Sequence, residues 1–103
     1  MFQIFYKGYF LSFYVYILKC ADGSFYTGHA DNLESRISAH SQRFYKNCYT
    51  ATRLPVKLVF VEEFGSRIEA LQAERKIKKW GQRKKNILIA FGWEGIIKLR
   101  KKK

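Results

Sequence analysis

Four side chains in the first half of this sequence carry groups that exchange protons or bind anions. Tyr16 and Tyr26 supply phenols, Arg36 a guanidinium and His40 an imidazole. Gathered in one place, such groups could bind an anionic substrate and move protons near it. Each has an ordinary alternative, because strand tyrosines usually pack in a core and an arginine–histidine pair on a helix usually faces solvent. The elements that hold these side chains decide between the two interpretations.

The two tyrosines lie in a predicted β-hairpin. The run FYVYILK, Phe13 to Lys19, is rich in aromatic and β-branched residues and predicts a strand. Asp22-Gly23 is a turn signal, and Ser24 to Gly28 is predicted to be the returning strand. Gly23 suits the left-handed backbone position that closes a three-residue loop.

The length of the hairpin loop decides whether the tyrosines share a face. A two-residue loop would set Tyr16 and Tyr26 on opposite faces of the sheet, because side chains alternate along a strand. A three-residue loop, Ala21 to Gly23, pairs Leu18 with Tyr26 and puts both phenols on one face. It also sets Tyr16 opposite Gly28, which leaves open space for the ring. We therefore predict the three-residue loop.

Helices and one more strand should complete the domain. Asp31 with Glu34 three residues later forms a capping box, which predicts a helix from near Asn32 to about Gln42. The remaining predicted elements are a loop over 43–54, a strand from Val56 to Phe64, a helix from the Ser66 cap to about Trp80, and a shorter helix from Lys84 to Phe91. The order β-β-α-β-α-α is typical of an α+β domain whose small, three-stranded, mainly antiparallel sheet is flanked by helices.

The first predicted helix carries two of the candidate side chains. Arg36 and His40 are four residues apart and project from one side of it. We predict that this side differs from the one that carries Leu33 and Ile37, which should face the core. The corner at residues 28–31 would then bring the phenols, the guanidinium and the imidazole toward a common mouth.

Glu74 is a carboxylate in an otherwise apolar arc of the second predicted helix. At about 100° per residue it falls about 40° from Ala70, on the side that also carries Ile77. An ionised carboxylate on a core-facing arc is costly unless it is paired or bound to a metal. The pattern leaves both interpretations open: a salt bridge to Arg36 or Lys78, or a metal ligand.

The charge of the chain is strongly positive and concentrated near its end. The net charge is +12, and residues 75–103 contain twelve Lys and Arg against one acid, Glu94. Such a field attracts polyanions, of which nucleic acid is the commonest. The predicted nucleic-acid-binding residues are His29, Arg75, Lys78, Lys79, Arg83, Lys84 and Lys85. The alternatives are a cationic face with no specific partner and an anionic membrane surface, and we expect no membrane association.

The cysteines indicate neither a disulfide framework nor a zinc site. Cys20 and Cys48 are far apart in the sequence and suit a reducing cytoplasm. A zinc site could be assembled only from these two with His29 and His40, and no pair among the four has a finger-like spacing.

The N-terminal residues 1–12 form an extension that the patterns do not assign to the domain. Its longest uncharged run, Gly8 to Leu18, is shorter than the ~20 residues of a membrane-spanning helix. It also lacks the basic start and the cleavage site of a signal peptide. One hypothesis is that residues 1–10 reflect the choice of start codon, with Leu11 encoded by an alternative start. The domain itself is predicted over 13–92, followed by a basic tail at 93–103.

Taken together, these residues resemble the GIY-YIG nuclease superfamily, and within it the small single-domain bacterial proteins related to the excinuclease nuclease domain. The family motifs fall on Tyr14-Val15-Tyr16, Tyr26-Thr27-Gly28, Arg36, His40 and Glu74. Tyr14 stands where the name-giving glycine would be, and Thr27 replaces an isoleucine. Both changes keep strand character. The resemblance runs from about Phe13 to Ala90.

The resemblance implies hydrolysis of phosphodiester bonds with one Mg²⁺ or Mn²⁺ ion. In that picture Glu74 is the sole protein ligand of the cation and Arg36 binds the phosphate. Tyr26, helped by Tyr16, orients or deprotonates the attacking water. Ionising a free phenol of pKa about 10 at pH 7 costs roughly 4 kcal/mol, so the imidazole of His40 is a rival base. The resemblance favours Tyr26.

We therefore expect a metal-dependent DNA endonuclease of the cytoplasm that acts in DNA repair or recombination. Branched or damaged DNA is the expected substrate, with RNA as an alternative. Asn86 is the candidate for a supporting asparagine of the family. The alternative function is a non-catalytic nucleic-acid-binding protein whose GIY-YIG site is unused.

Overall fold

Three antiparallel strands form the centre of the molecule, in the order β2-β1-β3. The computed structural model describes residues 12–42 and 49–101. In chain order the elements are β1 (Phe13–Lys19), β2 (Phe25–Ala30), α2 (Leu33–Ser41), the short 3₁₀ helix η1 (Tyr49–Thr52), β3 (Lys57–Phe64), α3 (Arg67–Lys78) and α4 (Gln82–Lys101). This arrangement confirms the predicted α+β class and the order β-β-α-β-α-α.

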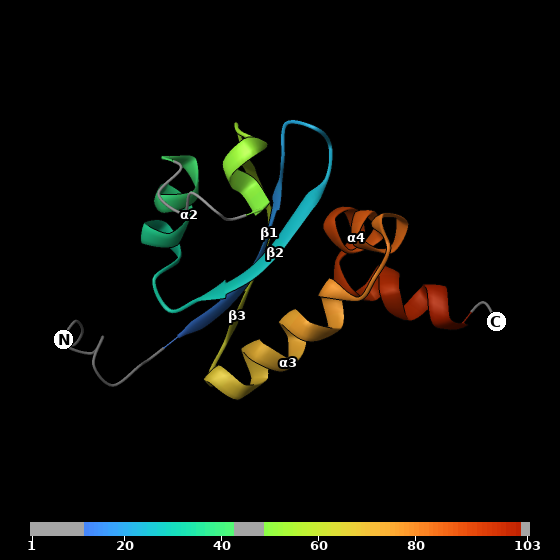
Figure 1. Ribbon diagram of the computed structural model, residues 1–103. Coiled ribbons are helices and arrows are strands. Elements are labelled where there is room, and N and C mark those ends of the chain that lie inside the picture. The colour runs from blue at the N-terminus through green and yellow to red at the C-terminus, as the bar shows by residue number, and fades with distance from the viewer. Residues whose placement is uncertain (1–11, 43–48, 102–103) are drawn as a thin grey trace.

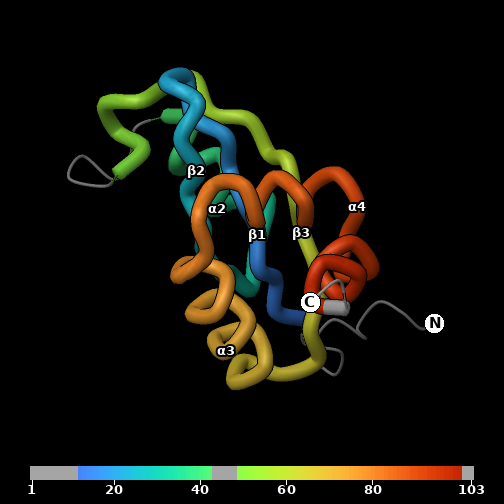
Figure 2. Tube along the Cα trace, turned by 90° about the vertical axis from the view of Figure 1, so that its right-hand side faces the viewer, coloured from blue at the N-terminus to red at the C-terminus, as the bar shows by residue number. Residues whose placement is uncertain are grey.

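The alternation of side chains along β1 creates one core on each face of the sheet. Val15 and Ile17 are fully buried on one face, where they pack against α3 and α4. Tyr16 and Leu18 are fully buried on the other face, beneath α2. Figure 1 shows α2 on one side of the sheet and α3 and α4 on the other, and Figure 2 shows the side that α3 and α4 cover.

The predicted hairpin register is confirmed. Leu18 lies opposite Tyr26 and Tyr16 opposite Gly28. The loop closes with the Gly23 N–H donating to the Cys20 carbonyl at 2.9 Å, and Gly23 has a φ of 88°. Because the loop has three residues, both phenols lie on the face that α2 covers.

The helix starts follow local capping chemistry, with one correction. At α3 the Ser66 hydroxyl accepts from the Glu69 N–H, as predicted. At α2 the cap is Asn32 rather than Asp31, because the Asn32 side chain accepts from the Ser35 N–H at 3.0 Å. Asparagine caps a helix as well as aspartate does, so the helix starts one residue later than the capping-box pattern suggests.

The C-terminal segment departs from the prediction of a basic tail after Gly92. Helix α4 continues to Lys101, with a break at Gly92, which has a φ of 69° and a ψ of −164°. Glycine tolerates this conformation, which is not helical, so the first helical part of α4 ends here, as predicted, and a second part follows at an angle. Beyond the break Ile96 is buried in the core, and Trp93 packs edge-on against Trp80 with the ring centroids 5.8 Å apart. These apolar contacts hold the part of α4 after Gly92 against the core, although the sequence predicted a basic tail there.

Some sequence predictions fall outside the described residues: the N-terminal extension through residue 11, the loop at 43–48, and Cys48 as a member of a zinc set. Within the described part of the chain, Cys20 is buried. None of the helices described there is both long and apolar enough to cross a membrane.

Candidate active site

Three rings form a close cluster between β1, β2 and α2. The Tyr16 hydroxyl lies 3.0 Å from Nε2 of His40, and Nδ1 of His40 lies 2.9 Å from the Thr50 hydroxyl. The Tyr26 ring packs against both neighbours, with its centroid 4.9 Å from that of His40 and 6.3 Å from that of Tyr16. Tyr16 and His40 are buried, whereas Tyr26 is only partly buried. The fixed imidazole therefore locks Tyr16 in place, and Tyr26 is the phenol of this pair that solvent reaches.

His40 lies on a different side of α2 from the one predicted. It is 2% exposed and faces the tyrosines, as do Leu33 and Ile37, which pack against the same cluster. His40 follows Leu33 by seven positions, which is almost two full turns of the helix. The two side chains therefore differ by only about 20° around the helix axis and face the same side. The prediction that the imidazole leaves the core-facing side was therefore wrong. Thr50, which fixes its other nitrogen, gave no recognisable signal in the sequence.

Glu74 is buried, as its place in the apolar arc predicted, with 8% of its surface exposed. One carboxylate oxygen lies 2.6 Å from Nδ1 of His29, and the other lies 3.0 Å from Nζ of Lys78. The ion pair with Lys78 is one of the two pairings that the sequence left open. The contact with His29 was not foreseen, since the two residues are far apart in the sequence and only packing of α3 on β2 brings them together.

The candidate side chains meet at β2, which is an edge strand. His29 lies opposite Val15 and therefore points to the α3 side, whereas the phenols point to the α2 side. Arg36 reaches this strand from α2, where its Nη1 donates to the His29 carbonyl at 3.4 Å. The structure thus places the three-ring cluster and the His29–Glu74 pair on opposite faces of one strand.

A divalent cation fits the donor set at Glu74 if water supplies most of its other ligands. No group of three or more His, Cys, Asp or Glu side chains that could hold a metal exists among the described residues. A site enclosed by protein ligands is therefore not available there. Mg²⁺ does not need one, because it keeps several waters and often takes only one or two carboxylates. Each oxygen of Glu74 has a second lone pair besides the one that faces His29 or Lys78.

Gly28 is the residue that lets the Tyr16 ring lie across β2. A Cβ atom at this position would stand 2.6 Å from the Tyr16 hydroxyl oxygen and 2.7 Å from Cζ of the same ring. Both distances are too short for atoms that do not share a bond. The glycine therefore supplies room for the phenol, as the predicted register required.

We expect Gly28→Ala to displace this phenol and break its bond to His40. The free energy of unfolding should fall by about 1–3 kcal/mol, as in other overpacked cores. Urea denaturation measures this loss. Gly65→Ala is the matched control, because a Cβ there meets nothing within 4 Å. Equal stability of the two variants would contradict this account of Gly28.

The buried imidazole should make the fold sensitive to mild acid. Burial lowers the pKa of His40, and the positive charge of Arg36 lowers it further. The unfolded chain takes up this proton near pH 6.5, where the folded protein resists it, so the free energy of unfolding should fall as the pH drops below about 6.5. Urea midpoints between about pH 8 and about pH 5 follow this loss. His40→Gln cannot titrate and should flatten the profile, and an undiminished slope in that variant would contradict the prediction.

A basic surface lies next to Glu74. Its exposed members are Arg75 and Lys78 on α3, Lys79 at the C-cap of α3 and Arg83 on α4. Lys84 and Lys85 on α4 are partly buried. Lys84 lies over the Trp80 ring at 4.4 Å. Burial lowers the pKa of Lys85, and the nearby charge of Lys78 lowers it further. Because Lys78 also pairs with Glu74, the positive surface and the candidate metal ligand are adjacent. Asn86 is exposed on α4.

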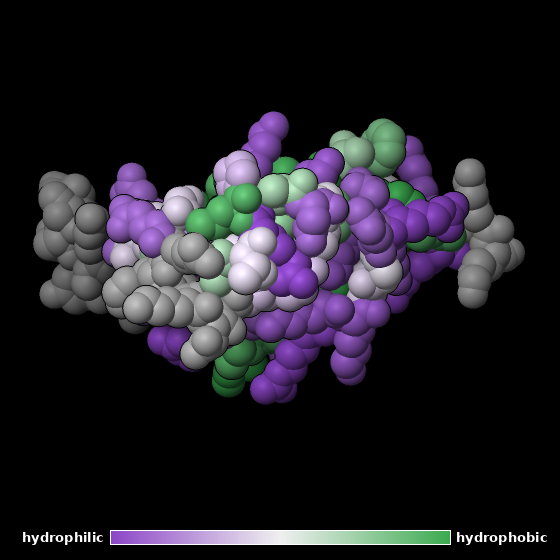
Figure 3. Space-filling view, turned by 45° about the horizontal axis from the view of Figure 1, so that its top comes forward, coloured by the Kyte–Doolittle hydropathy of each residue, from purple (hydrophilic) through white to green (hydrophobic). Residues whose placement is uncertain are grey.

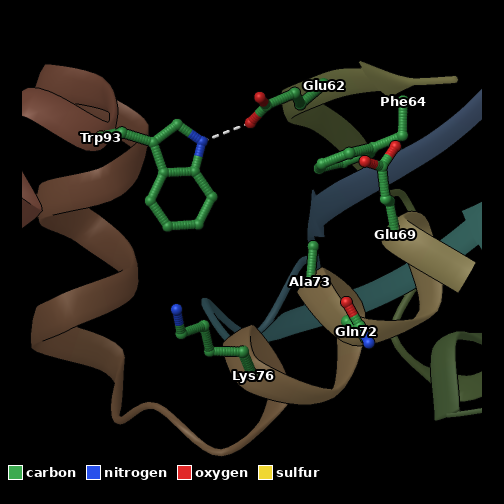
Figure 4. A pocket seen from close by; sticks show the side chains of 7 residues that line it. All are labelled: Glu62, Phe64, Glu69, Gln72, Ala73, Lys76 and Trp93. Carbon is green, nitrogen blue, oxygen red and sulfur yellow. Dashed lines mark hydrogen bonds between the residues drawn. The ribbon is translucent and has the colours of Figure 1, made fainter.

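A cavity of about 550 Å³ lies elsewhere, between β3, α3 and α4 (Figure 4). Its lining residues are Glu62, Phe64, Glu69, Gln72, Ala73, Lys76 and Trp93. The Trp93 indole N–H donates to the Glu62 carboxylate at its rim (Figure 4). Two carboxylates against one ammonium make this cavity a poor site for a phosphate. The candidate chemistry therefore belongs to β2 and not to this cavity.

Comparisons with known proteins identify the family of this chain. A family model described as the GIY-YIG catalytic domain matches residues 12–86. The chain belongs to the GIY-YIG family, which confirms the resemblance seen in its motifs.

Its relatives include small bacterial proteins called UPF0213. UPF0213 protein SSP2268 of Staphylococcus saprophyticus is 46% identical over 79 residues, which are 77% of this chain and 95% of that protein. The solution NMR structure of UPF0213 protein BH0048 from Bacillus halodurans has 37% identity and a TM-score of 0.52, and covers 86% of this chain and 97% of its own. That of EF2693 from E. faecalis has 36% identity and a TM-score of 0.53, with coverages of 78% and 85%.

Proposed function

We propose that this protein is an endonuclease that hydrolyses DNA phosphodiester bonds at the edge of β2 with the help of Mg²⁺ or Mn²⁺. The single observation that carries the proposal is the set of contacts around this strand. Tyr26 and Tyr16 lie on one face, Glu74 approaches from the other, and Arg36 reaches the strand between them. Membership of the GIY-YIG family supports it. DNA repair or recombination is the process in which we place this activity.

Tyr26 is our candidate for the group that orients or deprotonates the attacking water. His40 is a weaker candidate, because it is 2% exposed and both of its ring nitrogens have hydrogen-bond partners. The lowered pKa of His40 keeps its imidazole neutral near pH 7. A neutral imidazole can accept a hydrogen bond from the Tyr16 hydroxyl, which makes Tyr16 and His40 positioning residues for the Tyr26 ring.

Arg36 and Glu74 complete the proposed site. The Arg36 guanidinium would bind the scissile phosphate through two parallel hydrogen bonds, which stabilises the charge that builds on its oxygens. Glu74 would hold the cation, which when bound polarises the phosphate and stabilises the leaving oxygen. The contacts with His29 and Lys78 hold the carboxylate in position at the sheet.

The basic surface beside Glu74 would bind the phosphates that flank the cut. Contacts of this kind position DNA without reading its sequence, so we expect cleavage with weak sequence preference. The alternative is a nucleic-acid-binding protein with an unused site. It shares the basic surface but requires neither the cation nor the phenols.

The decisive experiment incubates the purified protein with duplex, branched, damaged and single-stranded DNA, and with RNA, in the presence and absence of Mg²⁺ and Mn²⁺. Cutting that needs the cation, and that disappears in Glu74→Gln, supports the endonuclease. Binding that weakens with salt, without any cutting on any substrate, supports the alternative function instead.

A further inference from the structure

The kinked helix α4 carries an exposed aromatic ring in a groove. Phe91 is 70% exposed, and it lines a groove of about 430 Å³ together with Ile87 and Leu99. A phenylalanine with that much exposed surface contributes little to the core of its own chain. At the α4 end of the molecule, apolar side chains stand out among hydrophilic ones (Figure 3).

The groove has charged walls of mainly positive sign. Arg83 and Lys98 line it from the two halves of α4, and Glu94 is the acid beside them. Residues 82–101 as a whole contain six Lys or Arg and this one acid. An anionic membrane surface would also attract these cations. However, the apolar part of the groove is a single ring with two aliphatic neighbours, which is small for insertion into lipid.

The two halves of α4 meet closely at Gly95, next to Phe91. A Cβ atom on Gly95 would stand 2.7 Å from Cβ of Phe91 and 3.0 Å from Cγ2 of Ile87. The absence of a side chain at Gly95 therefore lets the second half of α4 press against the first half. Phe91 therefore lies where the two halves of α4 meet, and its ring is exposed there.

We propose that this groove binds an unpaired base of the nucleic acid, stacked on Phe91, with Arg83 and Lys98 on the adjoining phosphates. Stacking on a phenylalanine face needs a base whose own face is free, so a continuous duplex cannot use the groove whereas a single strand, a flap or a gap can. Glu94 keeps phosphate out of the groove itself, because like charges repel. The inference rests on the proposed nucleic-acid function, but it does not depend on the cation or on Glu74.

The test uses the full chain, a chelator to prevent cleavage, and a single-stranded oligonucleotide of about twelve nucleotides that carries 2-aminopurine, a base that loses fluorescence when it stacks. Phe91→Ala should weaken binding about 5- to 100-fold and abolish the fluorescence loss. Phe91→Leu keeps apolar surface without a ring and should behave similarly. Ile68→Ala is the matched control, because Ile68 is 68% exposed on α3. Replacing Arg83 and Lys98 by Gln should reduce the dependence of binding on salt.

Each outcome separates this site from the nuclease function. If both Phe91 variants bind the oligonucleotide and quench its fluorescence as the wild type does, the proposal that the groove binds a base is wrong, even if the protein cuts DNA. Loss of binding in those variants would support the groove, even if the protein cuts nothing. If Phe91→Ala turns a dimer into a monomer in sedimentation and leaves oligonucleotide binding unchanged, the groove is a contact between two copies and the proposal is wrong.

Discussion

Tyr26→Phe is expected to slow DNA cleavage by about 10²- to 10⁴-fold at saturating DNA, the usual worth of a catalytic acid or base. The substitution removes one hydroxyl and keeps the ring, so the packing against His40 and Tyr16 should survive. DNA affinity should change little. Single-turnover cleavage and fluorescence anisotropy measure the two quantities separately.

Two other tyrosines are the controls for this result. Tyr49 stacks on Tyr26 with ring centroids 6.4 Å apart and is 42% exposed, so Tyr49→Phe should leave cleavage near the wild-type rate. Tyr16→Phe removes the bond to His40 and should have an intermediate effect. If Tyr26→Phe cleaves normally while His40→Ala does not, the base is His40 and our assignment is wrong.

Glu74→Gln is expected to reduce cleavage at least about a thousandfold, because a neutral amide is a poor ligand for a hard divalent cation. Such a cation stabilises the charge of the transition state by several kcal/mol. DNA should bind the variant as well as the wild type or more tightly, since one negative charge next to the basic surface is lost. Mg²⁺ or Mn²⁺ should also raise the melting temperature of the wild type and not that of the variant. Calorimetry measures this shift without any DNA.

Glu69→Gln tests whether the effect of Glu74→Gln comes from the position of the lost carboxylate or only from the change in net charge. Glu69 is an exposed carboxylate on the same helix, so its loss changes the net charge equally without touching β2. It should preserve both cleavage and the thermal response to the cation. A Glu74→Gln variant that still cuts DNA at the wild-type rate would remove Glu74 from the site.

Features set by short-range chemistry could be predicted from the sequence. The three-residue loop, with Gly23 in a left-handed conformation and Gly28 beneath the Tyr16 ring, fixed the face on which both phenols lie. The Ser66 cap marked the start of α3. The helical period placed Glu74 in the buried arc. In each case the deciding interaction lies within a few residues or follows from a fixed repeat.

The tertiary structure decided what distant segments do to one another. Only the packing of α3 on β2 pairs Glu74 with His29, and only the position of η1 provides Thr50 for His40. Packing of Ile96 and Trp93 on the core accompanies a second helical part of α4 after the break at Gly92, where the local signal predicted the break but only a basic tail beyond it. These contacts join residues far apart in the chain, and their energies depend on which surfaces meet. A sequence pattern identifies the reactive groups, but the fold determines that they approach β2 from two faces.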